Sequence, residues 1–82
     1  MKVAVDISLY PLQEDLIPPI KNVIERLSSH DNLYVDTNSM STQIRGDYDK
    51  VMALLQTEMR TTFEQLPKPI FVMKILNNPI AD

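Results

Sequence analysis

One turn of this 82-residue chain gathers most of the short polar side chains that could hold a small ligand. The polar residues of this turn are Thr37, Asn38, Ser39, Ser41 and Thr42. Their hydroxyl and amide groups donate and accept hydrogen bonds, and such short side chains lose little rotamer entropy when ordered. Met40, in the same turn, offers a polarizable surface that can pack on a flat ring. The turn is therefore a candidate ligand site, although its composition alone favours an ordinary polar hairpin.

The segments beside this turn add side chains that suit a heteroaromatic ligand. Tyr10 ends the first apolar segment and can stack on one face of a ring. Asp6 or Asp36 can accept a hydrogen bond from an amino group or neutralise a ring cation. The candidate ligand-binding residues are Asp6, Ser8, Tyr10, Asp36, Thr37, Ser39, Met40, Ser41 and Thr42.

The residue types argue against catalysis and against a metal centre. The only histidine, His30, is expected at the solvated end of a helix rather than as a general base. The chain has no cysteine, so it offers neither a thiolate nucleophile nor a cysteine-based metal site. The sequence suggests no Ser-His-Asp arrangement either. We therefore predict a binding protein that is not an enzyme and needs no cofactor or metal.

Composition limits the partners and the location. Eight Lys and Arg against eleven Asp and Glu give a formal net charge of -3. The basic residues are scattered from Lys2 to Lys74, whereas nucleic-acid binding needs a clustered basic face. Asp6 interrupts the first apolar run, and no stretch approaches the roughly 20 apolar residues of a membrane span. We expect one cytoplasmic domain that contacts neither nucleic acid nor membrane.

The elements that must position the candidate residues follow from hydrophobic periodicity. Apolar residues alternate over 3–10, 33–38 and 42–46, which predicts three strands, and the apolar run 70–76 predicts a fourth. Apolar residues at i, i+3, i+4 and i+7 predict a helix from Pro18 to Leu27 and another from Asp47 to just before Pro67. Asp47 is the expected N-cap of the second helix.

This order of elements predicts an α+β fold. Two split βαβ units with right-handed crossovers give a ferredoxin-like βαββαβ sandwich, in which a four-stranded antiparallel sheet carries two helices on one face. The first and third strands are expected to be central. We assign residues 1–77 to this single domain and residues 78–82 to a C-terminal tail. Gly46, the only glycine, predicts a sharp turn or a positive φ at the third strand's exit.

The last strand is apolar on both of its faces. Because the helices cover one face of the sheet, either Phe71, Met73 and Ile75 or the alternate residues must lie on the open face. An exposed apolar row of this kind is one that monomers tend to avoid. We therefore predict a homodimer or homotetramer. The alternative is that the tail after Asn77 covers the row.

Two segments of the chain resemble the YkoF-like thiamine-binding protein family. They are residues 6–12, DISLYPL, and residues 41–52, STQIRGDYDKVM, the second matching the family's hydroxyl-x-x-x-x-Gly-acid-x-acid-x-Val-Met pattern. The resemblance covers residues 1–77. It implies an ACT-resembling ferredoxin-like fold that assembles through its sheets and binds thiamine or its hydroxymethylpyrimidine moiety without catalysis. It also implies that the turn and the polar positions of the first strand line the pocket of a carrier or sensor.

Other functions remain open at this stage. The family's tandem members carry two such domains, so a chain with one domain can need a second subunit to complete its site. The open sheet face would also suit a structural or partner-binding module, and the fold would suit an ACT-type amino-acid sensor.

Overall fold

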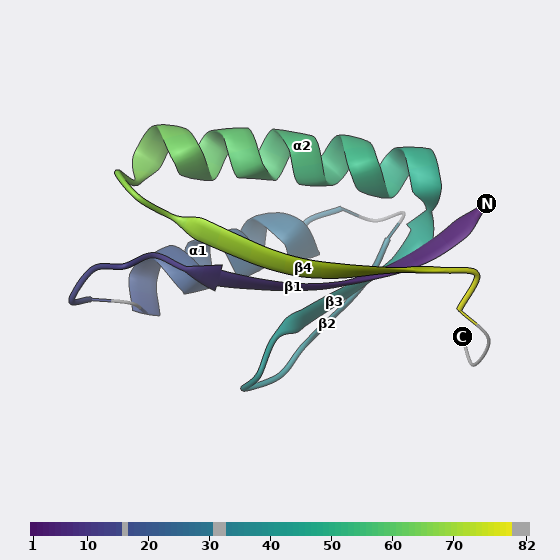
Figure 1. The fold of residues 1–82 in the computed structure, drawn as a ribbon, viewed down its shortest axis with the longest axis horizontal. Coiled ribbons are helices and arrows are strands. Elements are labelled where there is room, and N and C mark those ends of the chain that lie inside the picture. The colour runs from purple at the N-terminus through teal and green to yellow at the C-terminus, as the bar shows by residue number, and fades with distance from the viewer. Residues whose placement is uncertain (16, 31–32, 80–82) are drawn as a thin grey trace.

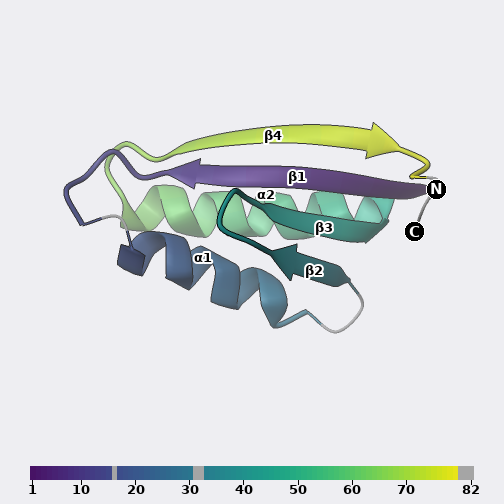
Figure 2. The same ribbon diagram turned by 90° about the horizontal axis from the view of Figure 1, so that it is seen from below.

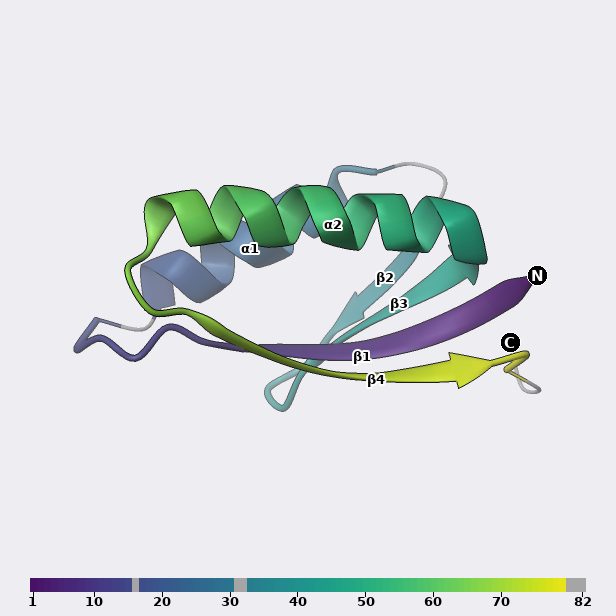
Figure 3. The same ribbon diagram turned by 45° about the horizontal axis from the view of Figure 1, so that its top comes forward.

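A computed structural model of the chain describes residues 1–15, 17–30 and 33–79 (Figure 1). Its elements follow the predicted order. They are β1 (Lys2–Tyr10), α1 (Ile17–Ser28), β2 (Tyr34–Thr37), β3 (Thr42–Asp47), α2 (Tyr48–Gln65) and β4 (Ile70–Asn77). The strands form one antiparallel sheet of order β2-β3-β1-β4, and both helices lie on the same face of it (Figures 1 and 3). The predicted ferredoxin-like fold, with β1 and β3 central, is confirmed.

Strand β1 is longer than its neighbour β3. It pairs with β4 from Val3 to Tyr10 but with β3 only from Lys2 to Ile7. Figure 2 shows β1 and β4 running on past the turn that joins β2 to β3. At its end, β1 therefore keeps a neighbouring strand on one side only, and α1 lies beside that opening.

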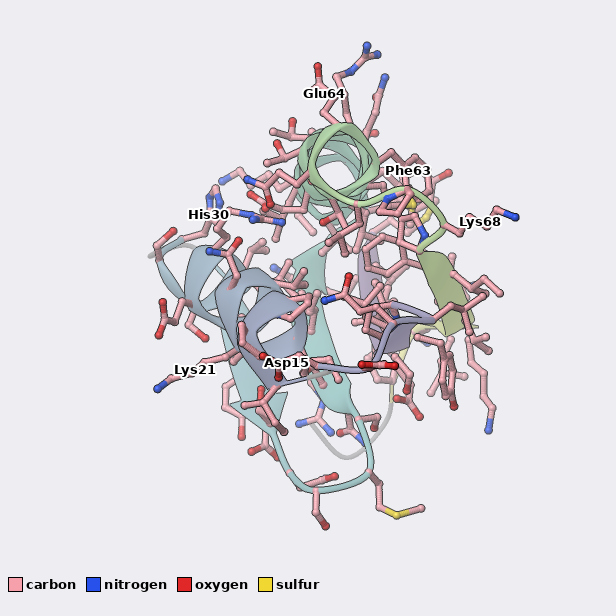
Figure 4. The ribbon with its side chains drawn as sticks, turned by 90° about the vertical axis from the view of Figure 1, so that its left-hand side faces the viewer. Asp15, Lys21, His30, Phe63, Glu64 and Lys68 are labelled. Atoms are coloured by element: carbon pink, nitrogen blue, oxygen red, sulfur yellow. The ribbon has the colours of Figure 1, made fainter. Side chains whose placement is uncertain are left out.

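The core lies between the helices and the face of the sheet that the sequence assigned to them. Its buried apolar residues are Val3, Val5, Ile7, Val23, Leu27, Ile44, Val51, Leu54 and Leu55. Phe63 belongs to the apolar stripe that predicts α2, but it lies outside the core. It is 53% exposed and contacts Phe71 of β4, with ring centroids 5.8 Å apart. Figure 4 shows Phe63 on the β4 side of α2.

The prediction of a positive φ at Gly46 is wrong. No glycine in the described residues has a positive φ, and β3 continues through Gly46 to Asp47. The reason for glycine is close packing, since a Cβ at this position would overlap Cδ2 of Leu33 and touch Val51. Glycine here lets the half-buried Leu33 side chain approach the β3 backbone.

Asp47 holds the N-cap position of α2 with an extended backbone, as predicted, but its side chain makes no capping hydrogen bond. Its carboxylate lies 3.7 Å from the N-terminal ammonium of Met1, while the amide of Tyr48 donates to the carbonyl of Met1 at 2.8 Å. The first residue of the chain thus satisfies one of the free amides of the α2 N-terminus.

A polar cluster that the sequence did not predict joins the two helices. Glu58 of α2 is 7% exposed and accepts from Nε of Arg26 of α1 at 2.5 Å. The same guanidinium donates to the hydroxyl of Thr62 at 2.7 Å and to Gln65 at 3.2 Å. His30 lies with Nε2 3.8 Å from Glu58, and Figure 4 shows it beside the two helices. Arg26 therefore ties α1 to α2 through a nearly buried carboxylate.

On β4, Phe71 and Met73 pack against the core, whereas Ile70, Val72 and Leu76 lie on the open face and are 46%, 51% and 57% exposed. The amide of Asn78, which has φ 57°, donates to the carbonyl of Lys2 at 2.9 Å. Residues 80–82 of the predicted tail lie outside the described residues.

Replacing Arg26 by Met should lower the free energy of unfolding by about 2–4 kcal/mol, because Glu58 would keep a nearly buried charge without its main partner. Urea denaturation followed by circular dichroism measures the loss. The double variant Arg26→Met/Glu58→Met should recover most of it, and Arg60→Met on the exposed side of α2 is the matched control. Equal losses for Arg26→Met and Arg60→Met would contradict this role.

Candidate functional site

A cavity of about 380 Å³ opens where β1 extends beyond its last pair with β3. Its walls come from the end of β1 and the loop after it, from the inner side of α1 and from the β2–β3 turn. The wall residues outside the turn are Ile7, Ser8, Leu9, Tyr10, Pro11, Leu12, Ile20, Val23, Ile24, Leu27 and Phe71. Volumes of this order are typical of pockets for small organic ligands.

The turn at the cavity rim is held by its own hydrogen bonds. The side-chain oxygen of Asn38 accepts from the amides of Met40 at 2.8 Å and Ser41 at 3.1 Å. The amide of Asn38 donates to the carbonyl of Ser41 at 3.0 Å, and the hydroxyls of Thr37 and Thr42 lie 3.1 Å apart. The rim therefore has a defined shape, with Ser39 and Met40 exposed at its tip.

The structure brings seven of the nine predicted site residues together around this cavity. They are Ser8, Tyr10, Thr37, Ser39, Met40, Ser41 and Thr42. These residues come from two segments separated by α1, so their assembly depends on the antiparallel register of β1 with β3. That these residues contact a ligand stays a prediction.

The two predicted aspartates lie elsewhere. Asp6 is opposite Gln43 and Lys74 on the open face, where it lines a separate hollow of about 240 Å³. Asp36 is opposite Gln43 on the edge strand β2 and is exposed. Strand alternation points both carboxylates away from the helices. Asp6 also lies in the part of β1 that β3 covers, whereas Ser8 and Tyr10 lie beyond the last β1–β3 pair and reach the cavity.

Sequence reasoning missed the cavity's α1 wall. The apolar stripe that predicts α1 consists of Ile20, Val23, Ile24 and Leu27, all expected in the core. Only Val23 and Leu27 are buried, while Ile20 and Ile24 remain half-exposed at the cavity. A stripe of four apolar residues on a helix so near the sheet edge was the available signal. No sequence signal pointed to Leu12. In the structure it lines the cavity with a φ of 53°, in the left-handed region.

The cavity is lined without charge. Among the described residues that line it there is no Asp, Glu, Lys, Arg or His, and its polar groups are hydroxyls, one amide and backbone. Lys21 of α1 extends away from the sheet (Figure 4). Apolar walls with a few neutral polar groups suit an uncharged, planar ligand that is partly desolvated on binding.

Within the described residues, no three of His, Cys, Asp and Glu gather as they would at a metal centre. His30, predicted to be solvated, has a side chain that is 45% exposed. Across the same described residues, no helix has both the length and the apolar character needed to cross a membrane.

Comparison with known proteins identifies the family of the chain. The family model described as thiamine-binding protein matches residues 5–79, nearly the whole chain. The match confirms the family assignment made from the sequence, while the narrower YkoF-like label stays a prediction. No curated protein matches the chain.

Several solved structures share the fold. A Streptococcus pneumoniae protein has a TM-score of 0.88 at 21% identity, covering 98% of this chain and 90% of its own. A Thermotoga maritima protein, provisionally described as a thiamine biosynthesis/salvage protein, has a TM-score of 0.86 at 22% identity, covering 95% and 85%. A hypothetical protein of Methanocaldococcus jannaschii has a TM-score of 0.81 at 25% identity, covering 99% and 84%. At these identities the likeness establishes the fold.

Asn38→Ala should lower the free energy of unfolding by about 0.5–1.5 kcal/mol and speed amide exchange at Met40 and Ser41. Both amides would lose the side-chain oxygen that accepts from them and would donate to water instead. Urea denaturation and hydrogen exchange by NMR measure the two effects. Asn38→Asp keeps an acceptor and is the control. If the alanine and aspartate variants exchange equally fast, the side chain does not order the rim.

Proposed function

We propose, because the chain belongs to the thiamine-binding protein family, that it binds thiamine or its hydroxymethylpyrimidine moiety in the cavity between β1, α1 and the β2–β3 turn. The protein would act without catalysis, as a cytoplasmic carrier or sensor. The cavity itself is the observation that carries the proposal, since it gathers residues from both sequence segments that resemble the family.

The affinity expected for a ligand of this size is compatible with a carrier or sensor. Thiamine has about 18 heavy atoms, and at roughly 0.3–0.5 kcal/mol per atom its binding would contribute about 5–9 kcal/mol. That corresponds to dissociation constants from about 100 μM to below 1 μM. Affinities in this range allow uptake and release at modest ligand concentrations, as a carrier or sensor needs.

Charge decides which end of thiamine enters the cavity. Thiamine carries a cationic thiazolium ring, and a buried charge without a partner is costly. Because the lining is uncharged, the neutral pyrimidine ring belongs inside, between the apolar α1 wall and the end of β1. The thiazolium would remain at the mouth, near the exposed Met40 and the solvent.

Assembly with a second copy is part of the proposal. Strand β4 lies at the edge of the sheet, and its open face presents Ile70, Val72 and Leu76 to solvent. Edge strands with exposed apolar side chains pair readily with another strand. Packing of this open face against the open face of a second copy would cover the row in a homodimer, and pairing between β4 edges would join two dimers in the homotetramer.

The binding proposal predicts micromolar binding of thiamine and of hydroxymethylpyrimidine in isothermal titration calorimetry. Ile24→Phe should weaken both by about tenfold or more, because the added ring occupies the cavity. Ile17→Phe is the matched control, since Ile17 lies on the same helix but is 69% exposed and outside the lining. Absence of heat and of a thermal shift at millimolar ligand would overturn the proposal.

The assembly proposal predicts a dimer or tetramer in analytical ultracentrifugation at micromolar concentration. Val72→Lys should convert it to a monomer, because a charge would be placed in the row that the second copy covers. Gln56→Lys adds the same charge on the exposed side of α2 and should leave the assembly unchanged. A wild-type monomer would contradict the proposed interface.

A further inference from the structure

The end of β1 presents a backbone edge to the cavity. In an antiparallel ladder the N–H and C=O of one residue point to the same side, and successive residues alternate between sides. The carbonyl of Met1 accepts from Tyr48, the residue after β3, and that of Lys2 accepts from Asn78, the residue after β4. Odd-numbered residues of β1 therefore face β3, and even-numbered residues face β4.

This alternation places the N–H and C=O of Leu9 on the cavity side. Pairing of β1 with β3 ends at Ile7 and Thr42. The next pair in the same register would join Leu9 to Met40, but Met40 belongs to the turn and is 85% exposed. Leu9 nevertheless stays extended through its pairing with Phe71 on β4. Its own N–H and C=O have no strand partner among the described residues and lie on the side of β1 that β3 leaves uncovered, and Leu9 is one of the residues that line the cavity.

Such a pair of groups demands a hydrogen-bonding partner. Backbone N–H and C=O groups that are removed from water without a hydrogen-bond partner destabilise a fold, so nearly all such groups have a partner. The N–H and C=O of one extended residue form a donor and an acceptor side by side. Their complement is a planar edge that carries an acceptor beside a donor, as a ring nitrogen beside an amino group does.

We infer that the backbone of Leu9 binds the aminopyrimidine edge of the ligand, with the Leu9 N–H donating to the ring nitrogen and the amino group donating to the Leu9 carbonyl. The ligand takes the place that a longer β3 would occupy, which is β-strand addition with a heterocycle instead of a peptide. The hydroxyl rim and the apolar α1 wall enclose the ring but leave this pairing to the backbone. The inference rests on the proposed function and names the group that selects an aminopyrimidine.

Two pyrimidines of the same shape test the inference. The first is 4-amino-5-hydroxymethyl-2-methylpyrimidine, and the second replaces its amino group by a methyl group, which has similar size but no donor. The methyl compound should bind roughly 10- to 100-fold more weakly, because the Leu9 carbonyl would be desolvated without a partner. Equal affinities would overturn the inference and leave the proposed function standing. Failure of both compounds and of thiamine to bind would overturn the proposed function, and the inference with it.

NMR on 15N-labelled protein supplies a readout on the backbone itself. On adding the aminopyrimidine, the Leu9 amide proton should shift downfield and exchange more slowly. The amide of Val5 is the matched control, since it faces β3 within the ladder opposite Ile44 and already has its partner. A Leu9 resonance that stays in place while the ligand binds would also overturn the inference.

Discussion

The unequal pairing of β1 is the constraint on which the rest of the structure depends. Its ladder with β4 runs from Val3 to Tyr10, while its ladder with β3 stops at Ile7. Where β3 is missing, neither strand nor helix fills the layer completely, so a cavity of about 380 Å³ remains beside α1. A hairpin two residues longer would pair with Leu9 and close the same space. The shortness of the β2–β3 hairpin is thus what leaves the fold a site.

The cavity also depends on where α1 is held. The apolar wall of α1 faces a partly empty space, so hydrophobic packing alone fixes this helix less firmly than α2. Arg26 compensates by joining Glu58 and Thr62 of α2 on the opposite side of the helix. Because the carboxylate of Glu58 is nearly buried, the geometry of this contact is strongly specified. The polar cluster and the cavity therefore lie on two sides of one helix.

Besides the outer edge of β2, the sheet has two unpaired strand edges whose surroundings differ. The edge at Leu9 is short and lies beside α1 and the turn, at the cavity. The edge at β4 is eight residues long, exposed and flanked by apolar side chains, so it suits another strand. The same backbone chemistry can thus support ligand binding at one place and assembly at the other, since side chains decide what can reach each edge.

The sequence alone determined the element order and the face of β1 that packs on the helices, because period-two and period-3.6 patterns are local. It also predicted seven of the residues that line the cavity. The sequence also indicated the family for the same reason, since each of the two characteristic segments is continuous in the chain. The lengths of the two ladders, the close contact of Leu33 with Gly46 and the Arg26–Glu58 pair join residues far apart in the chain, so no local pattern predicts them. Tertiary structure alone therefore decided that Asp6 and Asp36 lie away from the cavity, that Ile20 and Ile24 line it and that the Leu9 backbone faces it.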